Sequence, residues 1–187
     1  MKTHNLTRYV AFLRGINVGG NNLIKMEELR RALAALRFKN VRTFIASGNV
    51  IFESGETKRE LLAAQIERKV RKSFGHEISV VLQTIDDLKR ILKVDVFKKV
   101  KPGKDTMLFV VLLTSEPPRK PKLPLRNKNG SLELLAIKHR AAFIVCYRKP
   151  NGFFEFPNNY FEKKFEVIAT TRNWSTLNRI VAFAEDL

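Results

Sequence analysis

The segment VRTFIASGNVIFES, residues 41–54, decides the fold of this chain. Residues 41–46 and 50–54 are rich in β-branched and aromatic side chains, which favour strands. Between them lies Ser47-Gly48-Asn49, and a glycine at this point supplies the positive φ angle that a tight hairpin turn needs. The segment therefore predicts two short antiparallel strands joined by a turn.

One helix and one strand are predicted on each side of this hairpin. Residues 26–36 and 57–74 place apolar side chains every three to four positions, the period of a helix with one buried face. Residues 8–14 and 78–83 predict strands, and the first is apolar on both faces, which indicates a central position in a sheet. The predicted order is β-α-β-β-α-β, the ferredoxin-like arrangement.

The second half of the chain predicts a less regular set of elements. Residues 107–113 predict a buried strand, and residues 132–137 and 141–147 predict a hairpin. Short helices are predicted at residues 84–93 and 158–165, and Asn158 is expected to cap the second of them. Residues 114–130 contain four prolines and predict an irregular loop, and residues 172–185 predict a last helix.

These patterns together predict an α+β protein with two parts. We expect a ferredoxin-like domain at residues 1–83, packed on a second α+β subdomain at residues 84–187. The second part is expected to contain a mostly antiparallel sheet and to close with the C-terminal helix. A chain of 187 residues is long enough to bury the cores that this arrangement requires.

Composition predicts a cytoplasmic protein without a membrane segment. The longest uninterrupted apolar run, residues 107–113, has seven residues, whereas a membrane-spanning helix needs about 20. The single cysteine, Cys146, has no partner for an internal disulfide, which fits a reducing compartment. It lies in a predicted strand, where we interpret it as a buried apolar residue and not as a reactive thiol.

The charge of the chain favours anionic partners. The formal net charge is +17, and residues 89–128 hold twelve basic and three acidic residues. Nucleic acid is the first candidate for such a surface, and small anions are the second. The alternative is that the excess of lysine and arginine keeps the protein soluble.

No known catalytic or metal-binding motif occurs in the sequence. Phosphate-loop, zinc-protease and serine-hydrolase patterns are absent, and the histidines His4, His76 and His139 are scattered. With one cysteine in addition, the chain offers too few ligands for zinc, so no metal site is expected. The sequence identifies neither a cofactor nor a reaction, and it leaves open whether the protein is an enzyme.

Two segments are predicted to form a ligand site at one end of the first sheet. The first is the glycine-rich loop LRGINVGGNN, residues 13–22, and the second is Ser47-Gly48-Asn49. In a β-α-β unit the first two strands run parallel, so the loop after the first strand and the turn after the second lie at the same sheet edge. The candidate ligand-binding residues here are Arg14, Gly15, Asn17, Gly19, Gly20, Ser47, Gly48 and Asn49. Each segment also has a purely structural interpretation as a turn.

A third segment, TTRNWST at residues 170–176, adds candidate residues at the predicted start of the last helix. They are Thr171, Arg172, Asn173 and Thr176. A cation in the first turn of a helix opposes the helix dipole by about 0.3–1 kcal/mol, so Arg172 invites a carboxylate or a bound anion as its partner. Trp174 is expected to pack in the core.

These three segments resemble a bacterial family known as a domain of unknown function. The family pattern A-x-L-R-G-I-N-V-G-G corresponds to residues 11–20, T-[FY]-x-x-S-G-N to residues 43–49, and T-x-R-N-W-x-T to residues 170–176. Arg37 departs from the pattern, because the family has glycine after the first helix. The resemblance implies that the three segments form one site, and it supplies no reaction, cofactor or catalytic residue.

Two functions follow as hypotheses. The first is a small-ligand site in which the three segments hold an anionic or phosphate-bearing molecule, since arginine suits carboxylate and phosphate geometry. The second is nucleic-acid binding through the basic surface, although the first strand lacks the open aromatic face of ferredoxin-like RNA-binding modules. A structural or interaction module without catalysis is a third alternative.

Overall fold

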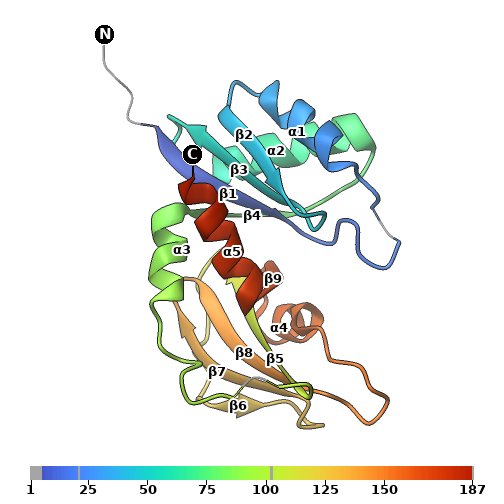
Figure 1. Cartoon of the computed structure of the whole chain (residues 1–187), viewed down its shortest axis with the longest axis vertical. Coiled ribbons are helices and arrows are strands. Elements are labelled where there is room, and N and C mark those ends of the chain that lie inside the picture. Colours follow the sequence, from blue (N-terminus) through green and yellow to red (C-terminus); the bar gives the residue numbers. More distant parts are fainter. Residues whose placement is uncertain (1–5, 21, 102, 187) are drawn as a thin grey trace. The chain divides into compact units, whose positions relative to one another are not determined.

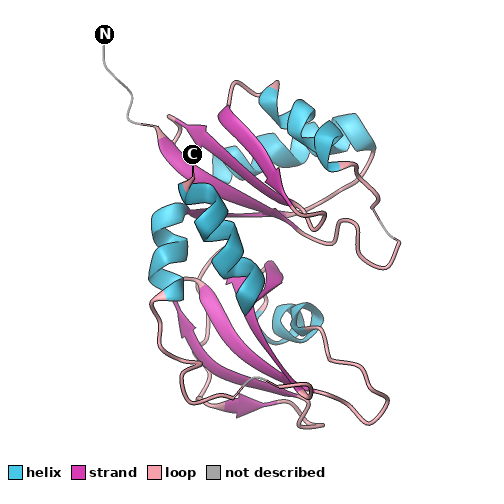
Figure 2. Ribbon diagram, in the orientation of Figure 1, coloured by secondary structure: helices cyan, strands magenta, loops and turns pink. Residues whose placement is uncertain are grey.

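The computed structural model describes residues 6–20, 22–101 and 103–186, which form two compact units (Figures 1 and 2). The first unit takes the chain up to Asp87 and again from Ile180 onward, and the second takes Leu88–Arg179. Each unit has its own sheet and its own hydrophobic core. Among the described residues, no helix is both long and apolar enough to cross a membrane.

The first unit contains the predicted β-α-β-β-α-β order. Its elements are β1 (Thr7–Leu13), α1 (Met26–Ala34), β2 (Lys39–Phe44), β3 (Asn49–Ser54), α2 (Arg59–Phe74) and β4 (Val80–Thr84). The strand order is β2-β3-β1-β4, and each neighbouring pair is antiparallel. This is the ferredoxin-like arrangement, so the predicted fold of the first half is confirmed.

The two helices of the first unit cover one face of its sheet (Figure 1). Alternate residues of β1, namely Tyr9, Ala11 and Leu13, point into the core shared with these helices. Leu29 and Leu33 of α1 lie in the same core, and α2 adds three apolar residues at four-residue spacing. The four-residue period read from the sequence thus marks the buried face of α2.

The opposite face of this sheet is also buried. Val10 and Phe12 of β1 and Ile51 of β3 are fully inaccessible to solvent. The chain from Ile180 onward belongs to this unit, and there the Phe183 ring lies 5.0 Å from that of Phe44. β1 is therefore covered on both faces, as its sequence predicts.

The second unit is built on a five-stranded antiparallel sheet. Its strands are β5 (Thr106–Leu113), β6 (Leu125–Arg126), β7 (Leu132–Lys138), β8 (Ala141–Tyr147) and β9 (Ala169–Asn173), in the order β6-β7-β8-β5-β9. α4 (Pro157–Phe165) packs on one face through Phe161 and Phe165. The unit boundaries fall within α3 (Ile85–Leu92) and α5 (Trp174–Glu185).

Three local predictions for the second half are wrong. The last helix begins at Trp174, because residues 169–173 form strand β9 beside β5. The loop at residues 114–130 includes the two-residue strand β6, which pairs with β7. Asn158 lies inside α4, whose cap position is Phe156, and no side chain caps that helix end.

Candidate functional site

The glycine-rich loop and the hairpin turn lie together at one end of the first sheet. The backbone N–H of Leu13 donates to the carbonyl of Gly48 over 2.8 Å. The side-chain amide of Asn17 donates to the carbonyl of Ala46, also over 2.8 Å. Gly48 is packed so closely that an added Cβ atom would lie 2.7 Å from Ile16. The strand directions of the β-α-β unit thus correctly predict that the loop and the turn lie side by side.

Two asparagines of the predicted site hold the loop and the turn in shape. The Asn17 amide donates to the carbonyl of Ile24 and accepts a hydrogen bond from the Ile24 N–H, in addition to its bond with Ala46. Buried Asn49 donates to the carbonyl of Phe44 and to the Ser47 hydroxyl. Their amide groups serve local backbone and turn contacts, which is the structural interpretation of both residues.

Within residues 14–20, the loop backbone adopts left-handed conformations at four positions, of which the last two are consecutive. Gly15, Gly19 and Gly20 have φ angles of 69°, 60° and 77°, and Asn17 has a φ angle of 54°. Left-handed residues next to right-handed or extended ones turn successive N–H groups toward a common side, where they can meet an anion. Gly19 and Gly20 are exposed, and Arg14 is half-buried at the start of the loop. Ser47 is half-buried in the facing turn.

Acidic groups close in sequence to this loop have cationic partners. Residues 14–25 contain no Asp or Glu. Glu27 and Glu28 begin α1, and they form ion pairs with Arg30 at 2.6 Å and with Lys25 at 3.7 Å, respectively. The hydrogen bond from Arg30 lowers the pKa of Glu27, so this carboxylate stays ionised and paired. An anion bound at this loop therefore meets these two carboxylates already paired with cations.

The third predicted segment lies in the second unit and is mostly strand. Thr170, Thr171 and Arg172 are buried in β9, where Arg172 is opposite Val110 of β5. Arg172 therefore does not lie in the first turn of a helix, and the dipole argument for it is wrong. Its guanidinium donates to the Thr170 hydroxyl over 3.0 Å and to the Thr171 carbonyl over 2.8 Å. Burial lowers the pKa of Arg172 to about 10, which still leaves it charged at neutral pH.

The other residues of this segment have local structural contacts. The Thr171 hydroxyl donates to the Asn158 side chain of α4. The Asn173 side chain accepts hydrogen bonds from the backbone N–H and the hydroxyl of Ser175, and it thereby caps α5. Thr176 is half-buried in the first turn of that helix. A single site that joins this segment with the loop and the turn of the first unit stays a prediction.

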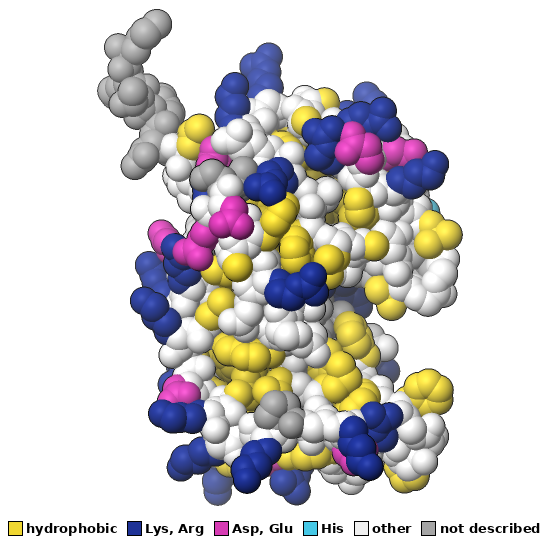
Figure 3. Space-filling view, viewed as in Figure 1, with side chains coloured by type: hydrophobic (Ala, Val, Ile, Leu, Met, Phe, Trp, Pro, Cys, Tyr) yellow, Lys and Arg dark blue, Asp and Glu magenta, His cyan; other side chains and the backbone are white. Residues whose placement is uncertain are grey.

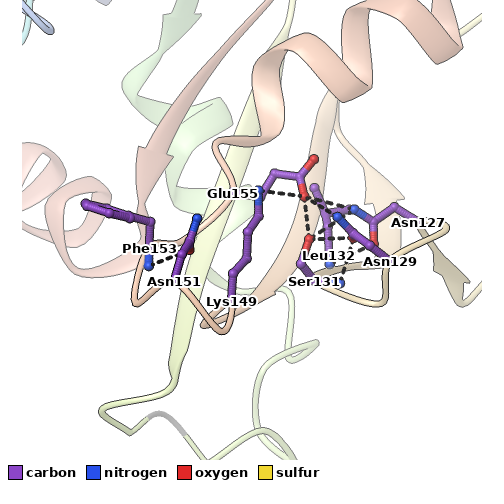
Figure 4. A network of polar contacts seen from close by, with 8 residues as sticks. All are labelled: Asn127, Asn129, Ser131, Leu132, Lys149, Asn151, Phe153 and Glu155. Atoms are coloured by element: carbon purple, nitrogen blue, oxygen red, sulfur yellow. Dashed lines mark hydrogen bonds and ion pairs between the residues drawn. The ribbon is translucent and has the colours of Figure 1, made fainter.

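The second unit contains a polar network that the sequence did not reveal (Figure 4). The Ser131 hydroxyl lies against the carboxylate of Glu155, and Lys149 forms an ion pair with the same carboxylate at 3.5 Å. Asn127 and Asn129 connect the turn before β7 to it. A hollow of about 350 Å³ lies beside this turn and residues 147–151. The sequence signal was the run Asn-Lys-Asn-Gly-Ser, whose side chains bond readily to nearby backbone.

The described residues contain neither a cluster of metal ligands nor an accessible thiol. Within residues 6–20, 22–101 and 103–186, no three His, Cys, Asp or Glu side chains are grouped in a way that would hold a metal ion. The Cys146 thiol is buried in β8, and burial raises its pKa to about 12. A thiol in this environment stays protonated and packs as an apolar side chain.

Comparison with known proteins gives a family and a fold. The family model described as "Protein of unknown function (DUF1697)" matches residues 6–143. A solved structure of a conserved bacterial protein from Streptococcus pneumoniae is similar with a TM-score of 0.67 and 20% sequence identity. The similarity covers 96% of this chain and 99% of that one. No curated protein matches the chain.

Proposed function

The chain belongs to the DUF1697 family of proteins of unknown function, and from its geometry we propose that the first unit binds a small anionic molecule. The ligand carries a phosphate or carboxylate group and binds between residues 14–20 of the glycine-rich loop and the hairpin turn at Ser47 and Gly48. Arg14 and the backbone N–H groups of Gly19 and Gly20 contact the anion. The proposal concerns binding and names no reaction.

One observation carries this proposal: the loop and the turn are fixed to each other by their own amide groups. Asn17 spans from Ile24 to Ala46, and the Leu13 N–H bonds to Gly48. A ligand therefore meets a loop that is already ordered and loses less binding free energy to ordering it. Two asparagines of the predicted site thus act as positioning residues, and the contacts to the ligand fall to Arg14 and the exposed glycines.

The chemistry of the loop favours an anion over a cation or a neutral ligand. Arginine presents several N–H donors in a planar fork that matches a carboxylate or a phosphate. Residues 14–25 add no acidic side chain, and Glu27 and Glu28 have cationic partners. An exposed glycine allows the backbone N–H to approach a ligand closely. These features together describe a small site for an oxyanion.

Nucleic-acid binding by the first sheet is less well supported. RNA-binding modules of this topology stack bases on aromatic residues of an open sheet face. Here the corresponding residues Val10, Phe12 and Ile51 are inaccessible. On the face seen in Figure 3, Lys and Arg side chains are scattered among neutral and apolar ones and form no continuous stripe. Nucleic acid would have to bind elsewhere.

Isothermal titration calorimetry tests the proposal with inorganic phosphate, nucleoside monophosphates, sugar phosphates and dicarboxylates. We expect at least one of these compounds to bind, and Arg14→Ala to weaken it at least tenfold, the loss of one charge-assisted contact. Arg14→Lys keeps the positive charge without the planar guanidinium group and should lose less affinity. Lys72→Ala, an exposed cation on α2, is the control for net charge and should bind as the wild type does. Equal affinities of the Arg14→Ala variant and the wild type would refute the site.

A further inference from the structure

Two phenylalanine side chains are exposed on one short segment of the second unit. Phe153 is 71% exposed and Phe156 is 54% exposed, at the connection between β8 and α4. Single apolar side chains on a surface are ordinary, but two large aromatic ones on one four-residue stretch call for an explanation. The Phe156 ring also packs edge-on against that of Phe109, with the ring centroids 6.2 Å apart.

The turn that precedes Phe153 is held by backbone and side-chain hydrogen bonds. Residues 149–152 form a turn in which the Gly152 N–H donates to the Lys149 carbonyl and the Lys149 N–H donates to the Phe153 carbonyl, both over 2.9 Å. The Arg148 guanidinium bonds to Asp105 and to the Gly152 carbonyl, and so ties the turn to the start of β5. Phe153 is therefore exposed because the backbone holds it there, and not because the segment lacks structure.

Figure 4 shows Phe153 pointing away from the polar network around Glu155. The hollow of about 350 Å³ lies beside the same turn, and its walls include Asn129, Ser131, Tyr147 and Asn151. Most of these polar groups are already bonded inside the protein, Ser131 and Asn129 to each other and to Glu155, and Tyr147 to Glu133. The turn thus places an exposed aromatic ring beside a polar hollow.

The charge around the turn is positive. Residues 103–105, 127–131 and 147–156 contain four basic residues, Lys104, Lys128, Arg148 and Lys149, against two acidic ones. Lysine is depleted in protein–protein interfaces, whereas aromatic rings beside basic side chains are typical of proteins that bind single-stranded nucleic acid. The net charge of +17 favours the same class of partner.

We propose that this surface, composed of Phe153 and Phe156 with Lys104 and Lys128, binds single-stranded nucleic acid. Bases stack on the two rings, and the lysines contact the phosphates of the backbone. This site is independent of the anion site proposed for the first unit.

Fluorescence anisotropy with labelled 12-nucleotide RNA and DNA of mixed sequence, at 50 and 200 mM salt, tests this proposal. We expect binding that weakens steeply with salt, because counterions are released from the phosphates. The double variant Phe153→Ala, Phe156→Ala should lose at least tenfold in affinity, since each stacked base contributes appreciably. Lys104→Ala with Lys128→Ala should weaken binding and reduce its salt dependence.

Leu61→Ala is the matched control, because Leu61 is a 53% exposed apolar residue on α2 of the first unit. It should bind the oligonucleotides as the wild type does. Absence of binding at 50 mM salt, or equal binding by the double phenylalanine variant, would overturn the proposal. So would sedimentation data in which that variant abolishes self-association while oligonucleotide affinity stays the same, since the patch would then be a protein interface.

Discussion

Gly48 is the residue at which the hairpin turn touches the glycine-rich loop. Its φ angle is 74°, and an added Cβ atom would lie 2.7 Å from Ile16 and 3.1 Å from Leu13. Gly48→Ala should therefore lower the free energy of unfolding by about 2–4 kcal/mol, which combines left-handed strain with overpacking. Gly75→Ala is the control, because Gly75 has the same φ angle and open space around it, so it should lose only about 1 kcal/mol. If urea unfolding shows equal losses of unfolding free energy for the two variants, the Ile16 side chain moves aside to admit the added methyl group.

Arg172 shows why residue type alone misleads. Its sequence position suggested a cation that opposes a helix dipole and invites an anionic partner, yet it is buried in β9 and bonds to Thr170 and Thr171. Arg172→Ala should lower the free energy of unfolding by more than about 1 kcal/mol, because it leaves a cavity and buried oxygens without their donor. Arg172→Met fills the space without a charge and should lose less. A loss below about 0.5 kcal/mol for the alanine variant in urea unfolding would contradict this account.

At the scale of elements, the turn that follows α1 contains a strained residue. Arg37 has a φ angle of 64°, the left-handed conformation that was expected if this position required the family's glycine. Arg37→Gly should stabilise the protein by up to about 1 kcal/mol, because glycine adopts this conformation without a steric penalty. Arg37→Ala is the control, since it removes the same charge and keeps the strain, and it should show no gain. Thermal unfolding of the wild type and the two variants shows whether a gain in stability comes from removing the charge or from relieving the strained backbone.

The polar network between the β6–β7 turn and the β8–α4 connection predicts a pH dependence of stability. The hydrogen bond from Ser131 lowers the pKa of Glu155 below its usual 4.5, with smaller contributions from Asn129 and Lys149. A carboxyl group with a lowered pKa stabilises the folded state above pH 4.5, and this contribution is lost as the pH falls through the folded-state value. Glu155→Gln should therefore cost about 1 kcal/mol at pH 7 and progressively less below pH 4.5. A difference in unfolding free energy that does not change with pH would exclude this role.

The sequence predicted the helices and strands whose local side-chain pattern is enough to determine them. The helices at α1 and α2 and the strands around residues 41–54 follow from side-chain periodicity and from Gly48. β9 was missed because its Thr-Thr-Arg-Asn run has no apolar alternation and continues directly into α5, so its pairing with β5 depends on a distant partner. The network around Glu155 was missed for the same reason, since Ser131 and Glu155 lie 24 residues apart in the chain.

At the scale of the whole molecule, chain direction predicted more of the candidate site than side-chain chemistry did. The proximity of loop and turn follows from the β-α-β order and is present in the first unit. The roles of Asn17 and Asn49 do not follow from their type, because an amide that fixes a turn and an amide that binds a ligand look alike in a sequence. For Arg14 and the exposed glycines, we still propose the role that the sequence suggested, which is binding of the anionic ligand.

The first unit is assembled from two stretches at opposite ends of the chain, since the segment from Ile180 onward belongs to it. Phe183 carries much of this contact: its ring lies 5.0 Å from that of Phe44, and the Arg42 guanidinium lies 3.8 Å from its centroid. Phe183→Ala should therefore lower the free energy of unfolding by about 1–3 kcal/mol, less than for a fully buried ring because Phe183 is only half-buried.

Hydrogen exchange locates this effect. Amides of β1 and β3 should exchange faster in the Phe183→Ala variant, because the sheet face that the C-terminal segment covers becomes accessible during local opening. Amides of β5 and β8 in the second unit should change little, since their pairing does not involve Phe183. Leu61→Ala removes an exposed side chain from the same unit and should leave both sets unchanged. Faster exchange confined to β5 and β8 would show that the last helix stabilises the second sheet and not the first.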